Sequence, residues 1–228
     1  MRWVTYLSPS GGAPRPGVVD DGCVLGYPGN ESLPELLSQD RSVLASAYQR
    51  AVAAPMEIIV EFETRLCPPF MPQQPVRILC GDQRVRTVDP EFVHGTDDSV
   101  VVPSPEAALV AHVGAAAVFS GQGRCVGYSL ACLWTLPDGR CAGLTFGPAV
   151  VTHEELDGSD ITVSGSIDDV PLAVTVIDGK LDWAEGISRA NGIVAATLDQ
   201  TRPLTAGEEL LVASDVLGEF EMRVCAEG

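Results

Sequence analysis

The chain has little positive charge. Of its 228 residues, 14 are lysine or arginine and 31 are aspartate or glutamate, which gives a formal net charge of −17 at pH 7. A surface this negative repels phosphate backbones and anionic lipid headgroups at long range. We therefore expect neither nucleic acid nor a membrane surface as a partner. Lys180 is the only lysine, so a mechanism that needs a lysine must use this residue.

Long apolar runs are also missing. The longest, residues 107–119, contains His112 and is well short of the ~18 residues that a membrane-spanning helix needs. The apolar stretch near Met1 is too short for the core of a secretory signal. Hydrophobic residues make up 46% of the chain and charged residues 20%, which excludes global disorder. We expect a soluble, cytoplasmic protein.

Cysteines occur without a recognisable pairing pattern. Their number is odd, no two have C-x-x-C spacing, and a chain of this length does not need disulfides for stability. We therefore expect buried free thiols. The seven are Cys23, Cys67, Cys80, Cys125, Cys132, Cys141 and Cys225.

Common catalytic and metal-binding motifs are absent. The sequence has no H-E-x-x-H, no phosphate-binding glycine loop, no G-x-S-x-G and no zinc-type Cys/His spacing. Its acidic pairs consist of adjacent residues, which on a strand point to opposite faces and cannot easily hold one ion. These pairs are Asp20-Asp21, Asp97-Asp98, Glu154-Glu155, Asp168-Asp169 and Glu208-Glu209. We interpret them as solvated turns.

Histidine is the natural general base near neutral pH, and the chain has three. His112 lies within an apolar β-type run, which favours a packed strand residue. His153 precedes two glutamates in a turn, which favours a solvated loop. His94 is followed by Gly95 and then by Thr-Asp-Asp, so an imidazole and two carboxylates lie close together. A functional and a structural role both remain open for His94.

The pattern predicts an α+β protein that is mostly β. Residues 1–66 are expected to form a small N-terminal domain with a hairpin, a helix over 33–53 broken near Asp40, and a strand over 58–66. Residues 67–75 hold four of the 17 prolines and are interpreted as a linker. Ser32 and Glu35 have the spacing of a capping box at the start of that helix.

Residues 76–228 are expected to form a β-rich domain. Short β-prone runs follow one another, separated by Gly, Pro and Asp turns. One helix is predicted over residues 182–198, with Asp182 as its N-cap and Glu185 three residues later, although it contains two glycines.

The order of several segments resembles the fumarylacetoacetate hydrolase family. Residues 1–27 followed by SLPELL resemble its N-terminal domain, and EAALVAHVG resembles its strand with an E-x-E metal pair. GYSLACLWTLPD resembles the family's strand with the third metal carboxylate, and GPAVVTHEEL resembles its G-P-x-hydrophobic-V-T segment. LTAGEELLVASDVLGEFEMRV resembles its C-terminal strands. The resemblance implies a mixed β-sandwich or β-roll domain of the catalytic type behind a small N-terminal α/β domain.

Carried over to this chain, the resemblance implies the loss of the metal. Glu106 matches the first metal-binding glutamate, but Ala108 stands at the second and Leu133 at the aspartate. One carboxylate cannot hold a cation that normally keeps three. The substrate-contacting lysine of the family has no counterpart, since Lys180 lies in a turn, and residues 79–90 lack the family's N-Y-x-D-H-x-x-E lid pattern. We expect no metal and no other cofactor.

Two functions follow from this resemblance. The first is a metal-independent enzyme of bacterial, biosynthetic small-molecule metabolism that isomerises, cyclises or decarboxylates a small enolisable or polyene substrate in an apolar pocket. The second is an inactive relative that acts as a binding or oligomerisation partner. The enzyme hypothesis assigns catalysis to Glu106, His94 and Tyr128, and substrate contact to Ala108, Leu133, Ser214 and Asp215.

Two further expectations accompany these functions. A roomy cavity around Ala108 and Leu133 would favour the enzyme, and a filled site would favour the inactive relative. The family resemblance also implies a homodimer.

Overall fold

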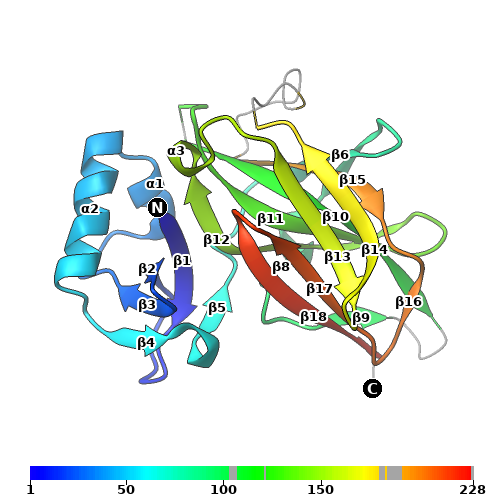
Figure 1. Ribbon diagram of the computed structural model, residues 1–228, viewed down its shortest axis with the longest axis horizontal. Helices are drawn as coiled ribbons and strands as arrows, with labels where there is room; N and C mark the ends of the chain where they lie inside the picture. The colour runs from blue at the N-terminus through cyan, green and yellow to red at the C-terminus, as the bar shows by residue number, and fades with distance from the viewer. Residues whose placement is uncertain (103–106, 121, 180–182, 184–191, 227–228) are drawn as a thin grey trace.

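The computed structural model describes residues 1–102, 107–120, 122–179, 183 and 192–226 (Figure 1). In this part of the chain, 13 strands belong to one large sheet and five strands form a second sheet. The path through the large sheet is β4-β3-β2-β1-β12-β11-β10-β15-β6-β7, and that through the second sheet is β14-β13-β17-β18-β9. The fold is therefore α+β and mostly β, as the sequence predicts.

The N-terminal segment contributes one end of the large sheet. Its elements are β1 (Arg2–Leu7), β2 (Arg15–Asp20), β3 (Cys23–Gly26), α1 (Leu33–Leu37), α2 (Arg41–Ala53), β4 (Ile58–Val60), η1 (Glu61–Glu63) and β5 (Arg65–Cys67). β1 pairs antiparallel with β12 (Cys141–Thr152), so hydrogen bonding is continuous from this segment into the rest of the sheet. The division into two domains at residues 67–75 stays a prediction.

The helical prediction for residues 33–53 is confirmed, including its break. α1 ends at Leu37, and α2 begins after Asp40. Ser32 donates its backbone N–H and its hydroxyl to Glu35 at 2.7 Å, as the capping-box spacing indicates. Among the described residues, no helix is both long enough and apolar enough to span a membrane.

The single strand predicted over residues 58–66 is wrong at its centre. The short 3-10 turn η1 separates β4 from β5, and the two strands pair with different partners, β3 and β1. The polar sequence Glu-Phe-Glu lies in this turn.

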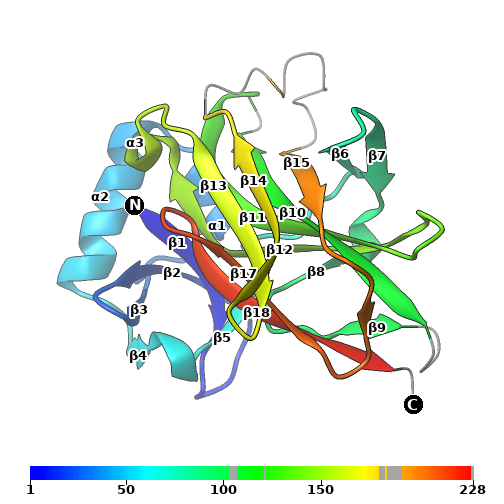
Figure 2. The same ribbon diagram turned by 45° about the vertical axis from the view of Figure 1, so that its right-hand side comes forward.

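The central and C-terminal parts of the chain build two stacked sheets (Figures 1 and 2). Their longest strands, β10 (Ala108–Phe119), β11 (Cys125–Thr135) and β12, are antiparallel neighbours in the large sheet. The other elements are β6 (Val76–Cys80), β7 (Val85–Val88), η2 (Pro90–Phe92), β8 (Val93–His94), β9 (Val100–Val102), α3 (His153–Leu156), β13 (Ile161–Ile167), β14 (Val170–Ile177), β15 (Ile193–Gln200), β16 (Leu204–Thr205), β17 (Glu209–Ser214) and β18 (Gly218–Ala226).

The long strands are buried on both faces. Alternate residues of β10 and β11, such as Val113 and Trp134, pack in the core between the two sheets. The intervening residues, such as Ala116 and Leu133, pack in a second core that also contains α1, β6 and part of β15. Burial on both faces explains why residues 107–119 read as a nearly continuous apolar run instead of an alternating one.

The helix predicted over residues 182–198 is wrong where the structure describes it. Residues from Ile193 to Leu198 belong to strand β15, which pairs parallel with β6 and antiparallel with β10. Pairing on both sides favours the β-branched residues of this segment over a weak helix that contains glycines. Residues 184–191 lie outside the described part of the chain.

Candidate functional site

A cavity of about 320 Å³ lies at the C-terminal ends of β6 and β15. These strands run parallel, so both end at the same edge of the sheet. β10 passes alongside β15 with His112 opposite Gln200, and β7 returns from β6 and contributes Arg86. We call this space the His112 cavity. Its lining residues are Cys80, Gly81, Asp82, Arg86, His112, Leu198, Asp199 and Gln200.

His112 is a nearly buried imidazole at the edge of this cavity. It is 9% exposed, and its Nε2 lies 3.0 Å from the hydroxyl of Thr135 on β11. Burial lowers the pKa of His112, and the positive charge of Arg86 lowers it further, while Asp82 opposes this effect. The ring is therefore neutral near pH 7. In the tautomer in which Nε2–H donates to Thr135, Nδ1 has the free lone pair and can accept a proton from a ligand.

Arg86 supplies a cation beside this imidazole. Its Nη1 donates to the carbonyl of Gly139, and its buried Nε has no hydrogen-bond partner among the described residues. It also forms no salt bridge with any carboxylate in the described part of the chain. A half-buried guanidinium with an unused donor is suited to bind a carboxylate or another oxyanion.

The two carboxylates that line the cavity are engaged by backbone N–H groups. Asp82 accepts from the N–H of Arg84 at 3.0 Å. Asp199 accepts from Val174 and from Gln200, both at 2.9 Å and with a different oxygen for each. Their main effect is therefore to hold the ends of β6 and β15 in place.

Cys80 is the thiol of this cavity. It is 2% exposed, and burial raises its pKa, although Arg86 favours the thiolate. The group is protonated near pH 7, which makes it a poor nucleophile. All seven cysteines are free, but only Cys80 and Cys132 are fully buried, so the expectation of buried thiols is met by these two.

Four other cavities occupy about 350–420 Å³ each. One is acidic and includes Asp168, Asp169 and Glu208, two adjoin each other at Phe70 and Met71, and one lies near Tyr27. Of these five cavities in the described structure, the His112 cavity is the one that contains an imidazole.

Tyr128 and His94, which the sequence analysis assigns to catalysis, are placed away from this cavity. Tyr128 is buried between the sheets, where its hydroxyl donates to the carbonyl of Gly179 at 2.9 Å and burial raises its pKa. His94 lies on β8 beside β12. The nearby carboxylates accept backbone N–H groups, Asp97 from Leu66 and Asp98 from Gly95. The segment after His94 is therefore a turn fixed by its own carboxylates.

The predicted substrate-contacting residues do not converge. Ala108 begins β10 and lies opposite Thr205. Leu133 lies opposite His112, which is four residues after Ala108 on β10. Four residues of strand separate the two positions by about 13 Å along β10. Leu133 is fully buried in the core, so the expected apolar cavity around Ala108 and Leu133 is not among the five described cavities.

The other predicted site residues are also distant or not described. Ser214 ends β17 with a buried hydroxyl, and Asp215 follows it in an exposed turn. Neither lines one of the five cavities. Glu106 and Lys180 lie outside the described residues, and the catalytic role of Glu106 stays a prediction.

The described residues do not fit the metal that the family resemblance implies. Neither Ala108 nor Leu133 has a side-chain donor atom. No group of three His, Cys, Asp or Glu side chains is placed to hold an ion in the described part of the chain.

Sequence reasoning missed His112 and Arg86 as candidate residues. The signal for His112 was its place as the one strongly polar side chain within the apolar run 107–119. For Arg86 we find no sequence signal, since its proximity to His112 depends on how β6, β7, β15 and β10 lie side by side.

Comparisons with known proteins bear on the fold. No protein-family model and no curated protein sequence matches the chain. Maleylpyruvate hydrolase from Sphingobium sp. SYK-6, solved with manganese(II) ion and pyruvate, matches with a TM-score of 0.80 at 17% identity. Fumarylacetoacetate hydrolase from Exiguobacterium antarcticum matches with a TM-score of 0.73 at 17% sequence identity. A probable 2-hydroxyhepta-2,4-diene-1,7-dioate isomerase from Mycobacterium abscessus matches with a TM-score of 0.72 at 20% sequence identity.

Each of these matches covers 100% of both chains. The chain therefore has the fumarylacetoacetate hydrolase-like fold, and the resemblance seen in its sequence is confirmed at the level of fold.

Proposed function

We propose that the chain is an enzyme with the fumarylacetoacetate hydrolase-like fold that moves a proton from one carbon to another of a small enolisable carboxylate. The reaction takes place in the His112 cavity and uses no metal ion. The observation that carries this proposal is that one cavity of about 320 Å³ holds both a neutral, nearly buried imidazole and a guanidinium that forms no salt bridge with a described carboxylate. A cavity of this size suits a small organic molecule.

In this proposal His112 acts as the general base and then as the general acid. Nδ1 takes a proton from the carbon next to the substrate carbonyl, and the electron pair of that C–H bond forms the enolate. The imidazolium returns the proton at a different carbon of the conjugated system, which completes an isomerisation with no net change in protons.

Arg86 has the complementary role. Its unpaired Nε–H and positive charge bind the substrate carboxylate or the enolate oxygen, where negative charge develops in the transition state. Proton removal beside a carbonyl requires such stabilisation, because an unassisted enolate is too basic for an imidazole to form.

Two structural neighbours support this substrate class. The Mycobacterium abscessus protein is named for a 2-hydroxy-2,4-diene dioate, which is an enol with two carboxylates, and the Sphingobium enzyme was solved with pyruvate. Both compounds combine an enolisable centre with a carboxylate, which matches the imidazole and guanidinium of the cavity.

A second candidate function is a binding protein without turnover. The observation that favours it is the complete burial of Leu133 at the position that the resemblance aligns with the third metal carboxylate. A chain released from selection for catalysis can fill such a position with a packed alkyl group and still bind a carboxylate at Arg86.

Proton exchange distinguishes the two functions. The protein, dialysed against EDTA, is incubated in D2O with pyruvate, 2-oxobutanoate or 2-hydroxyhepta-2,4-diene-1,7-dioate, and exchange is followed by 1H NMR. We expect exchange on at least one compound and a decrease of about 100-fold or more in His112→Gln. His94→Gln is the matched control, since His94 is not among the residues that line the His112 cavity, and a loss of exchange in this variant alone would instead favour the catalytic role that the sequence analysis gives to His94. Binding without exchange for all three compounds would support the binding protein and refute the enzyme.

A further inference from the structure

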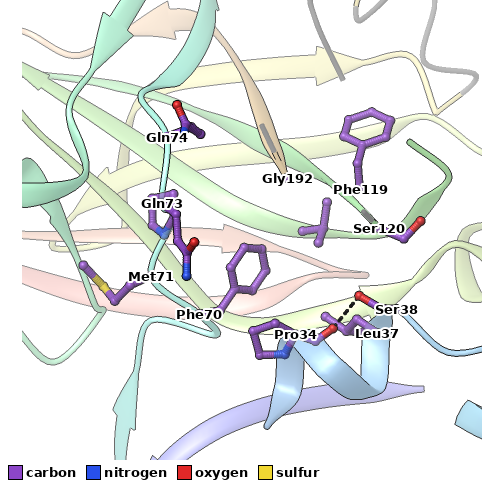
Figure 3. A pocket seen from close by; sticks show the side chains of 12 residues that line it. Pro34, Leu37, Ser38, Phe70, Met71, Gln73, Gln74, Phe119, Ser120 and Gly192 are labelled. Carbon is purple, nitrogen blue, oxygen red and sulfur yellow. Dashed lines mark hydrogen bonds between the residues drawn. The ribbon is translucent and has the colours of Figure 1, made fainter. Parts of the chain in front are cut away.

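A second cavity of about 350 Å³ lies between helix α1, the Pro-rich segment (residues 67–75), the C-terminal end of β10 and the N-terminal end of β15 (Figure 3). We call it the Ser120 cavity. It contains Gly192, immediately before β15, whereas the His112 cavity contains Gln200, the last residue of β15. Eight residues of strand place the two cavities about 26 Å apart, so they are distinct sites.

The walls of the Ser120 cavity are apolar. Pro34 and Leu37 come from α1, Phe70 and Met71 from the Pro-rich segment, and Val118 from β10. Figure 3 shows the Phe70 ring between the α1 residues and Gly192. Phe70 makes an edge-to-face contact with Phe146, with ring centroids 5.6 Å apart. A fixed aromatic ring of this kind offers a surface on which a planar ligand can pack.

Among the described residues that line this cavity, the polar groups are all uncharged. They are Ser38, Gln73, Gln74 and Ser120. A charged ligand would lose its hydration here without gaining a counter-ion, which is costly. The lining therefore selects against carboxylates and ammonium groups.

Ser120 provides an independent indication of a ligand. The residue is 7% exposed, and its hydroxyl is buried without a hydrogen-bond partner among the described residues. Buried hydroxyls are nearly always paired, so an unpaired one at a cavity wall is a site that a ligand can satisfy. Ser38 differs, because its hydroxyl already donates to the carbonyl of Pro34 at 2.7 Å.

We propose that the Ser120 cavity binds a neutral small molecule that has a planar apolar ring and one amide, carbonyl or phenol group. The ring packs against Phe70 and Leu37, and the polar group pairs with the hydroxyl of Ser120. This site is separate from the His112 cavity and does not depend on the reaction proposed there.

Three ring compounds of similar shape test the proposal: benzamide, benzoate and benzylammonium. Binding to the full chain is measured by ligand-observed NMR titration, and the site is located by NOEs from the ligand ring to Phe70. We expect benzamide to bind at least tenfold more tightly than either charged compound. The Ser120→Ala variant is expected to weaken benzamide binding about fivefold, the effect of one hydrogen bond.

Two matched variants serve as controls. Ser38→Ala removes a hydroxyl that is already paired, and His112→Gln alters the other cavity, so each should change benzamide affinity by less than about twofold. Far-UV circular dichroism confirms that the variants are folded. The proposal is overturned if benzoate binds as tightly as benzamide, if Ser120→Ala retains full affinity, or if benzamide does not bind at millimolar concentrations.

Discussion

His112 and Leu133 lie directly opposite each other on β10 and β11. Paired residues of neighbouring strands project to the same face, so the candidate general base borders the position that the resemblance aligns with the third metal carboxylate. An alkyl side chain fills that position, and the imidazole of the candidate site lies on the neighbouring strand.

Introducing a carboxylate at Leu133 is expected to destabilise the fold without creating a metal site. Leu133→Asp places a charged group in the core, at a cost of roughly 3 kcal/mol or more in free energy of unfolding. Urea unfolding at pH 7 measures this loss, and Leu133→Met, a volume-conserving change, should cost less than about 1.5 kcal/mol. Stabilisation of Leu133→Asp by 1 mM Mn²⁺ would contradict the conclusion that the described residues do not fit a metal ion, since Ala108 has no side-chain donor to complete such a site.

Local patterns predicted the elements that form within a short stretch of chain. The capping pair Ser32 and Glu35 marks the start of α1, and Asp40 marks the break before α2. The segment from Ile193 onward was assigned to a helix because its strand character depends on β6 and β10, which are distant in the sequence. The residues of a short segment do not show which distant strands will pair with it, so the local sequence could not have prevented the assignment of this segment to a helix.

The pH dependence of stability is expected to change when His112 is replaced. Burial lowers the pKa of His112 in the folded chain, while the unfolded chain titrates near 6.5. Below that pH the unfolded state therefore binds a proton that the folded state does not, and stability is lost as the pH falls from 6.5 toward the folded-state pKa.

This loss should be smaller in His112→Gln than in the wild-type chain. Urea unfolding between pH 7.5 and 5 measures the slope in both proteins. Identical slopes for His112→Gln and the wild-type chain would mean that the imidazole is not held neutral by its surroundings.

The candidate site was harder to predict than the fold. Adjacency in sequence favoured His94, which lies close to Asp97 and Asp98, but those carboxylates bind backbone N–H groups. His112 and Arg86 are 26 positions apart and meet only through the order of strands in the sheet. A histidine within a buried strand is indistinguishable from a packed residue until its neighbours are known.

Thr135 is expected to position the imidazole of His112. Thr135→Val removes the hydroxyl that lies 3.0 Å from Nε2, so the ring loses a contact that fixes its orientation. We expect kcat for the proposed proton exchange to fall about tenfold while KM changes little, because Arg86 still binds the substrate. Thr135→Ser keeps the hydroxyl and should restore most of the rate. Failure of serine to rescue would indicate that the methyl group matters through packing.

Arg86 is expected to determine affinity for carboxylates. Arg86→Gln removes the positive charge that the described carboxylates leave unpaired, and we expect the Kd for pyruvate to increase at least tenfold, as for the loss of a charge-assisted hydrogen bond. Arg84→Gln is the matched control, because Arg84 is exposed and lies beside Asp82. Isothermal titration at two salt concentrations provides the measurement. Equal losses in the two variants would show that general electrostatic attraction, and not the guanidinium of the cavity, governs binding.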